Sequence, residues 1–264
     1  MRQKRTRILV TNDDGIYAKG IEVLAEHLRS VAEVTVVAPD HERSAAGHAI
    51  TLWDPLRVTS VDRNGAFFGY AVDGTPADCV KIAIQRLMRK KPDLVVSGIN
   101  LGPNTGANVI YSGTVSAALE GAVLGIPSMA VSLMTFRRPL FAVAAQVARD
   151  ICLKIPALRL PPQVVLNVNV PNRPKAKLRG ICVTHQSRSH WSEAFDRRTD
   201  PRGTAYYWLK GERREVDSDP TSDERAAQRG YVSVTPISID LTSYKHLATL
   251  RELETRRRAH VLRG

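Results

Sequence analysis

The amino-acid sequence predicts an α/β protein of Rossmann-like type, in which helices flank a mostly parallel sheet on both faces. Short runs of β-branched residues, such as residues 8–11 and 34–38, alternate with longer stretches whose apolar residues recur at helical spacing. A chain of 264 residues that is 43% hydrophobic is long enough to bury a three-layer core. We therefore expect residues 1–264 to form a single α/β domain.

The apolar pattern and the Gly and Pro residues place the individual elements. One helix start is especially well marked: Thr75 is a capping residue, Pro76 fits the first turn, and Asp78 lies where a carboxylate meets free backbone amides. The elements are expected, in chain order, as strand 8–11, helix 21–31, strand 34–38, helix 76–89, strand 93–97, helix 114–124, strand 128–133, helix 141–155 and strands 164–170, 180–184 and 231–239.

Residues 186–230 interrupt this pattern, because they are polar and charged and yet contain several large aromatic side chains. These are Trp191, Phe195, Tyr206, Tyr207 and Trp208. Disordered segments seldom carry so many aromatic residues, so we expect an arm or hairpin that projects from the core and is ordered by packing on another subunit. A mobile surface loop is the alternative. Residues 242–264 are expected to form a charged helix and tail with no place in the core.

The formal net charge of +12 indicates anionic partners, but its distribution does not indicate a nucleic-acid surface. The basic residues form several short clusters along the chain, and none is interleaved with the aromatic residues that stack on bases. We interpret these clusters as solvated faces and expect no nucleic-acid partner. A small phosphate-bearing substrate also benefits from a positive field, so charge alone does not separate an enzyme from a nucleic-acid binder.

The amino terminus and the cysteines bear on the compartment. The apolar run that follows the basic amino terminus covers only residues 8–10, which is far too short for a signal-peptide core or a membrane span. We therefore expect a cytoplasmic protein without a membrane partner. Cys79, Cys152 and Cys182 lie far apart in apolar segments, so they are interpreted as reduced, buried thiols rather than as a disulfide or zinc framework.

Polar side chains follow three of the predicted strands, and ligands of open α/β sheets bind at the carboxyl ends of strands. The candidates are Asp13, Asp14, Ser44 and Asn100. They offer only oxygen donors, which suit Mg²⁺ or Mn²⁺, whereas zinc usually recruits His or Cys. Two carboxylates ~4 Å apart repel by roughly 4 kcal/mol at an effective dielectric constant near 20, unless a cation or shared proton compensates. The alternative is that residues 12–15 are ordinary turn residues with both carboxylates in water.

A second group of residues is suited to an anion. Asn104 and the run Ser112, Gly113 and Thr114 lie near the predicted start of a helix, where free amides and the helix dipole favour negative charge. Hydroxyl and amide groups at these positions would donate hydrogen bonds to a phosphate, and Gly113 would let the backbone approach closely. The alternative is that Ser112 or Thr114 is an ordinary N-cap.

Several familiar motifs are missing from the sequence. It contains no GxxxxGK[ST] phosphate loop, no HExxH, no GxSxG and no GxGxxG after the first predicted strand. Nucleoside-triphosphate and dinucleotide binding are therefore disfavoured. His41 and His48 flank Ser44 and are left without a role, because an exposed loop histidine is usually incidental.

Several linked motifs, in order along nearly the whole chain, resemble the SurE family of survival proteins. They are residues 10–15 (Val-Thr-Asn-Asp-Asp-Gly), 38–40 (Ala-Pro-Asp) with Arg43 and Ser44, 73–79 (Asp-Gly-Thr-Pro-Ala-Asp-Cys), 97–104 (Ser-Gly-Ile-Asn-Leu-Gly-Pro-Asn), 111–115 (Tyr-Ser-Gly-Thr-Val) and 230–236 (Gly-Tyr-Val-Ser-Val-Thr-Pro). The resemblance implies a Rossmann-like, metal-dependent 5'- and 3'-nucleotidase, often with activity on short polyphosphate.

Carried over motif by motif, the resemblance implies one divalent metal ion per subunit, Mg²⁺ or Mn²⁺. Its ligands fall on Asp13, Asp14, Ser44 and Asn100, and the phosphate site falls on Asn104, Ser112, Gly113 and Thr114. The resemblance also implies that the 186–230 arm and the C-terminal helix exchange between subunits of a homodimer or homotetramer. One departure puts the substrate preference in doubt: residues 45–48 read Ala-Ala-Gly-His, although relatives frequently have Gly directly after the serine.

The resulting hypothesis is a metal-dependent phosphomonoesterase. It would hydrolyse nucleoside 5'-monophosphates, and also 3'-monophosphates or short polyphosphate, with Asp13, Asp14 and Asn104 as catalytic residues. The nucleophile is either a metal-activated water or an Asp carboxylate. The alternatives are a nucleotide sensor that has lost turnover and a nucleic-acid-binding protein, whose affinity would fall steeply with salt.

Overall fold

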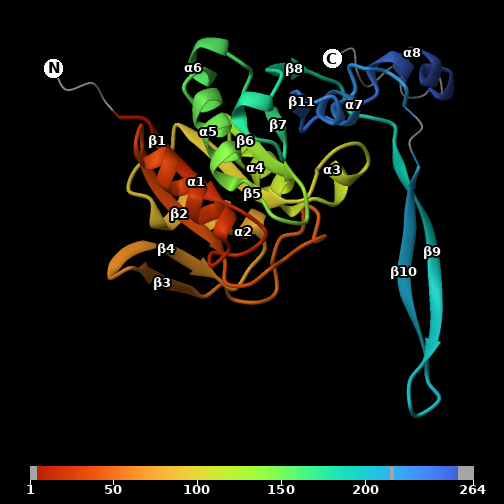
Figure 1. Ribbon diagram of the computed structural model, residues 1–264, viewed down its shortest axis with the longest axis horizontal. Coiled ribbons are helices and arrows are strands. Elements are labelled where there is room, and N and C mark those ends of the chain that lie inside the picture. The colour runs from red at the N-terminus through yellow and green to blue at the C-terminus, as the bar shows by residue number, and fades with distance from the viewer. Residues whose placement is uncertain (1–4, 215–216, 255–264) are drawn as a thin grey trace.

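A nine-stranded, mostly parallel sheet forms the centre of the protein (Figure 1). This is a computed structural model, and it describes residues 5–214 and 217–254. The strands of this sheet are β1 (Arg7–Thr11), β2 (Glu33–Pro39), β3 (Val58–Arg63), β4 (Ala66–Val72), β5 (Leu94–Leu101), β6 (Ser128–Met134), β7 (Val164–Pro171), β8 (Ile181–Val183) and β11 (Val232–Ser238). Their order is β3-β4-β2-β1-β5-β6-β7-β11-β8, and the strands from β4 to β7 run parallel. The predicted α/β fold class is confirmed.

Strand β1 lies between β2 and β5, and the candidate residues lie near the carboxyl ends of these strands. The chain first crosses from β1 to β2 on one side and later returns to β5 on the other side. Such a reversal of strand order is where open α/β sheets bind ligands. Thr11 pairs with Ser97, so the segments that follow β1 and β5 leave the same edge of the sheet.

Helices cover both faces of the sheet. They are α1 (Lys19–Arg29), α2 (Pro76–Ile82), α3 (Asn108–Tyr111), α4 (Gly113–Val123), α5 (Phe141–Cys152), α6 (Ile155–Leu158), α7 (Asp223–Gln228) and α8 (Leu247–Leu250), with short helical turns η1 (Ala83–Leu87), η2 (Lys175–Lys177), η3 (Tyr244–His246) and η4 (Arg251–Leu253). Helices α1 and α5 pack together on one face, and α2 and α4 pack together on the other. Each pair closes its own apolar cluster against the sheet.

The start of α2 has the predicted capping arrangement. The Thr75 hydroxyl accepts a hydrogen bond from the Asp78 backbone N–H at 3.1 Å, and the Asp78 carboxylate accepts one from the Thr75 N–H at 2.9 Å. Asp78 also accepts from the backbone N–H and the hydroxyl of Thr51, at 3.0 and 2.6 Å. The helix expected over 76–89 is regular only to Ile82 and continues as the π-helical turn η1.

A hairpin of β3 and β4 was not expected from the sequence. Its turn consists of Asn64 and Gly65, whose φ angles are 52° and 75°. Asn-Gly is the preferred pair for a two-residue hairpin in which both residues need positive φ, so the signal was present in the sequence.

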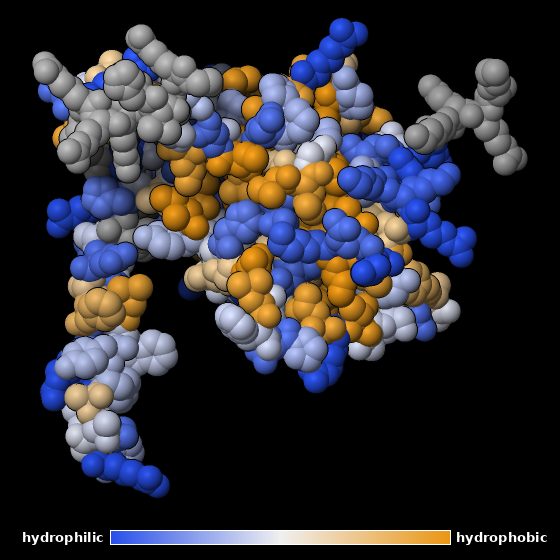
Figure 2. Space-filling model, turned by 180° about the vertical axis from the view of Figure 1, so that it is seen from behind, coloured by the Kyte–Doolittle hydropathy of each residue, from blue (hydrophilic) through white to orange (hydrophobic). Residues whose placement is uncertain are grey.

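The expected arm is a two-stranded antiparallel hairpin of β9 (His190–Thr199) and β10 (Ala205–Arg214), and it projects from the body (Figure 1). Seen from behind, it carries apolar side chains near its root and a hydrophilic tip (Figure 2). The hairpin spans fewer residues than the arm predicted over 186–230. The chain returns to the body after it, because Ala226 and Ala227 of α7 are buried there.

The expected C-terminal helix, residues 242–264, is not a continuous helix over its described part. Residues 244–253 form only the short turns η3, α8 and η4, and their side chains are exposed. Such short helices are marginal without an apolar face to pack. Residues 255–264 lie outside the described residues.

The described helices and the cysteines bear on the expected compartment. None of the described helices is long and apolar enough to cross a membrane, and the cytoplasmic location stays a prediction. Cys79 and Cys152 are buried free thiols as expected, whereas Cys182 is only half-buried because it lies on the edge strand β8.

The Asp78 cluster yields a stability prediction. We expect Asp78→Ala to lower the free energy of unfolding by about 2–3 kcal/mol, because it removes the cap and leaves the Thr51 N–H without its acceptor. Urea denaturation followed by circular dichroism measures this. Asp62→Ala, at an exposed position of β3, is the control and should stay within about 0.5 kcal/mol of the wild type. Equal stability of the two variants would contradict the assigned role.

Candidate functional site

Asp13 follows β1 after one intervening residue, and hydrogen bonds from two other segments hold it. Its side chain is 4% exposed, and the Thr114 hydroxyl from α4 donates a hydrogen bond to its Oδ1. Its backbone carbonyl accepts from the Arg43 N–H at 2.8 Å, which ties the segment after β2 to the segment after β1. Three segments, those after β1 and β2 and the start of α4, therefore meet at this one residue.

Asp14 is half-buried, and the charge of the adjacent Asp13 acts on it. Burial and the neighbouring Asp13 carboxylate raise the pKa of Asp14 to about 7, although the Leu101 backbone N–H favours its charged form. Burial likewise raises the pKa of Asp13, and the Thr114 hydroxyl offsets part of this effect. Glu42 raises both pKa values through its negative charge. The site therefore concentrates more negative charge than its own donors compensate.

A divalent cation fits this arrangement. Within residues 5–214 and 217–254, no lysine or arginine forms an ion pair with Asp13 or Asp14. The buried Oδ1 of Asn12 also lacks a donor among the described residues. No three His, Cys, Asp or Glu side chains of the described chain cluster as metal ligands, so a cation here needs neutral oxygen donors beside the two carboxylates. That donor set suits Mg²⁺ or Mn²⁺.

The other two expected metal ligands are Ser44, in the segment after β2, and Asn100, near the end of β5, and each is oriented by a hydrogen bond to a residue two positions away. The Ser44 side chain is exposed, and its hydroxyl donates to Glu42 Oε1 at 2.7 Å, which leaves the oxygen lone pairs open to a cation. The Asn100 amide nitrogen donates to the Gly102 carbonyl at 2.8 Å and keeps its carbonyl oxygen as a possible ligand. Glu42 was not singled out from the sequence, because its relation to the carboxylate pair depends on the loop conformation.

The expected phosphate-binding run begins α4, and its residues have different tasks in the structure. Ser112 is the N-cap, and its hydroxyl oxygen accepts from the Val115 N–H at 3.1 Å. Thr114 is fully buried and turns its hydroxyl to Asp13. A Cβ atom on Gly113 would lie 2.8 Å from Asp13 Cβ and 2.9 Å from its Oδ2. The start of α4 is therefore packed directly against the carboxylate, and only glycine fits at position 113.

Asn104, the other expected phosphate residue, is clamped by asparagines of β7. Its backbone N–H donates to Asn169 Oδ1 at 2.9 Å, and its carbonyl accepts from the side-chain amides of Asn169 and Asn167 at 3.0 and 2.8 Å. Its own side-chain amide donates to Ser132 Oγ at 2.8 Å. Residues 164–170 were expected only as a strand, and this clamp was not expected from the sequence. Two asparagines at alternate positions of a buried strand were the available signal.

His48, which the sequence left without a role, anchors the loop that carries Ser44. Its Nε2 pairs with Glu120 Oε2 at 2.9 Å, and Lys81 Nζ pairs with Glu120 Oε1 at 2.7 Å. Burial acts to raise the pKa of Glu120, but hydrogen bonds from His48 and Lys81 outweigh it and hold that pKa below its ordinary value. Since Glu120 belongs to α4, this cluster fastens the loop to the helix that also supports Asp13.

Fold and site together define an α/β protein with a partly buried carboxylate pair at the switch point of its sheet, next to the amino terminus of a helix. The family model described as "Survival protein SurE" matches residues 8–193, and the chain belongs to this family.

Relatives of known name or structure match most of the chain. A protein of Syntrophobacter fumaroxidans named 5'-nucleotidase SurE is 56% identical over 244 residues, covering 92% of this chain and 98% of the relative. A protein of the same name from Syntrophus aciditrophicus is 52% identical, covering 94% and 93%. The crystal structure of the SurE protein from Aquifex aeolicus has a TM-score of 0.83 and 42% identity, and covers 94% of this chain and 100% of that one.

The contact of Gly113 with Asp13 yields a second stability prediction. Alanine normally stabilises a helix by about 0.5–1 kcal/mol relative to glycine, but here the added methyl group overlaps Asp13 and costs about 1–3 kcal/mol. We therefore expect Gly113→Ala to lower the free energy of unfolding in urea. Val123→Ala, at an exposed position of the same helix, should not. A Gly113→Ala protein more stable than the wild type would show that Asp13 does not pack as described.

Proposed function

We propose that this protein is a 5'-nucleotidase that hydrolyses the phosphomonoester of nucleoside 5'-monophosphates with the help of Mg²⁺ or Mn²⁺. The observation that carries this proposal is the Asp13–Asp14 pair, in which Asp13 is buried and packed against the start of α4, Asp14 is half-buried, and neither has a basic partner in the described part of the chain. The name 5'-nucleotidase SurE, borne by relatives that are 46–56% identical, supports the same reaction.

In this proposal, four residues hold one divalent cation per subunit. They are Asp13, Asp14, Ser44 and Asn100. When bound, the cation polarises a phosphoryl oxygen and offsets the negative charge that develops in the transition state. Thr114 keeps the Asp13 carboxylate in place through its hydroxyl, and Glu42 orients the Ser44 hydroxyl. The burial of Asp13 excludes water from the carboxylate and strengthens its interaction with positive charge.

The start of α4 and Asn104 bind the phosphate. Gly113 occupies the first helical position, where the helix dipole favours an anion. The Ser112 hydroxyl uses its oxygen as the cap and has its hydrogen left to donate. Asn104 offers the second N–H of its amide, and the clamp of Asn167 and Asn169 fixes its position. Thr114 supports this site through Asp13.

The proposal is tested by phosphate release from 5'-AMP, 3'-AMP and tripolyphosphate in Mg²⁺, Mn²⁺ or EDTA. We expect release from 5'-AMP that depends on the metal, and we propose weaker activity on the other two substrates. Asp13→Asn keeps the shape of the side chain but removes its charge, and should lower kcat by at least about 100-fold, corresponding to about 3 kcal/mol.

The control for this assay is Asp62→Asn on the exposed face of β3, which should retain wild-type activity. Acid-quenched protein that carries phospho-aspartate would assign the nucleophile to a carboxylate rather than to water. Absence of release with every metal would contradict the proposed function and favour a nucleotide sensor. Full activity of Asp13→Asn would contradict the assigned site.

We also propose that the arm joins subunits in a homodimer or homotetramer. A two-stranded hairpin without a core of its own is marginally stable in water. This one exposes Phe195 and Trp208, which are 67% and 58% accessible and point to opposite faces of the ribbon. Packing on another subunit would bury these side chains.

Sedimentation velocity tests the proposed assembly. The wild type should sediment as a dimer or tetramer, and Phe195→Ser combined with Trp208→Ser should shift it toward the monomer. Arg202→Ser, in the turn of the hairpin, is the matched control and should leave the mass unchanged. A wild-type monomer at micromolar concentration, or a double variant with the wild-type mass, would contradict an assembly built on the arm.

A further inference from the structure

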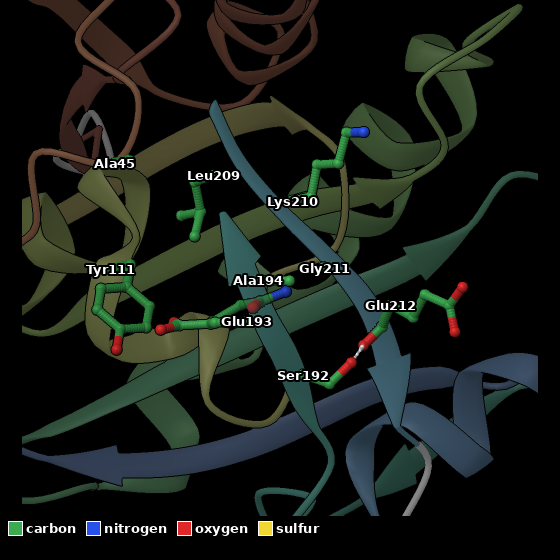
Figure 3. A pocket seen from close by; sticks show the side chains of 10 residues that line it. Ala45, Tyr111, Ser192, Glu193, Ala194, Leu209, Lys210, Gly211 and Glu212 are labelled. Atoms are coloured by element: carbon green, nitrogen blue, oxygen red, sulfur yellow. Dashed lines mark hydrogen bonds between the residues drawn. The ribbon is translucent and has the colours of Figure 1, made fainter. Parts of the chain in front are cut away.

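A cavity of about 1040 Å³ lies between the root of the arm and the segments that carry Ser44 and Ser112 (Figure 3). Ala45, Asn108 and Tyr111 line it from the body, and residues 192–194 and 209–212 line it from the two strands of the arm. It is large enough for a small organic ligand. Neither the motifs in the sequence nor the proposed metal and phosphate residues account for it.

The cavity begins where the proposed phosphate site ends. Ala45 directly follows Ser44, and Tyr111 directly precedes Ser112. The Gly47 N–H donates to the Tyr111 carbonyl at 3.2 Å, so the two body segments form one continuous wall. A molecule whose phosphate lies beside Ser44 and Ser112 would therefore extend the rest of its atoms into this cavity.

The walls of the cavity offer flat and apolar surface to a ligand. Tyr111 is 59% exposed and Leu209 is 62% exposed, although both are large side chains that proteins usually bury. Leu209 extends from the arm toward the Tyr111 side (Figure 3). Strand pairing places Gly211 opposite Glu193 on the same face of the hairpin, and Gly211 adds no side chain to fill the space. A planar ring placed here would have an aromatic surface on one side and an aliphatic wall on the other.

The charges around the cavity favour a neutral ligand with hydrogen-bond donors. The Glu193 carboxylate points toward Tyr111, where it can accept from an N–H or O–H group (Figure 3). Lys210 also lines the cavity, but it pairs with Asp196 at 2.9 Å. A further phosphate group in the cavity would meet the Glu193 carboxylate, and the one cationic side chain among the described lining residues already has an acidic partner.

We propose that this cavity binds the nucleoside part of the substrate, with the base against the Tyr111 ring and Leu209 as the facing wall. The inference rests on the proposed nucleotidase function. It adds that this cavity makes the enzyme select nucleotides over other phosphomonoesters. The arm thus contributes to the substrate site as well as to the proposed assembly.

The test compares two substrates with the same reacting group. Ribose 5-phosphate has the phosphate ester of 5'-AMP but no base, so the ratio of kcat/KM for 5'-AMP to kcat/KM for ribose 5-phosphate reports the base alone. We expect Tyr111→Ala to lower this ratio about 10-fold or more, as for the loss of one base-stacking aromatic residue. Tyr111→Phe keeps the ring face and should restore most of the ratio, and Leu209→Ser should lower it less.

Tyr207→Ala is the matched control, because Tyr207 is also 59% exposed and lies on the arm but does not line the cavity. Its ratio should equal that of the wild type. An unchanged ratio in both Tyr111→Ala and Leu209→Ser would overturn the assignment of the cavity while leaving the nucleotidase function intact. A wild-type protein that hydrolyses neither substrate would refute the proposed function, and this inference with it.

Discussion

The structure is organised around two adjacent carboxylates that are held close together and largely shielded from water. Asp13 and Asp14 follow the buried parallel strand β1, and burial together with the neighbouring carboxylate raises the pKa of Asp14 to about 7. Such a pair is unfavourable in an isolated fold, because each charge loses hydration and repels the other. The surrounding elements fix the pair in place: Thr114 binds one carboxylate, Gly113 packs on it, and Arg43 holds its backbone. This concentration of negative charge is the reason for proposing a cation at the site.

The segments around this pair have little regular structure, and buried polar side chains position them instead. Asp78 holds the segment at Thr51, Asn169 holds Asn104 through its backbone N–H and carbonyl, and Asp223 accepts from the Gly106 N–H at 3.0 Å. Each of these side chains is almost completely buried. A buried hydrogen-bond donor left without its acceptor is costly, so such contacts select one conformation of a loop. The loops can therefore carry functional groups without losing their geometry.

Local patterns in the sequence correctly predicted the positions of the central strands and the start of α2. They also predicted which polar residues lie at the strand ends. They were sufficient because β-branched runs and helix caps act within a few residues. The contact of Thr114 with Asp13 joins residues 101 positions apart, and no local pattern contains it. The β3–β4 hairpin is different, because the Asn64-Gly65 pair that forms its turn is a local signal in the sequence from which the hairpin could have been predicted. The length of the C-terminal helix was overestimated, because a helical pattern in the sequence does not provide the packing partner that a stable helix needs.

Titration calorimetry of Mn²⁺ into the purified, metal-stripped full chain, for the wild type and for Asp14→Asn, measures whether the carboxylate pair holds a cation. We expect one Mn²⁺ per chain for the wild type and binding at least about 100-fold weaker for the variant, a difference of about 3 kcal/mol. Equal binding by the two proteins, or no binding by the wild type, would contradict the claim that this carboxylate pair is built to hold a cation.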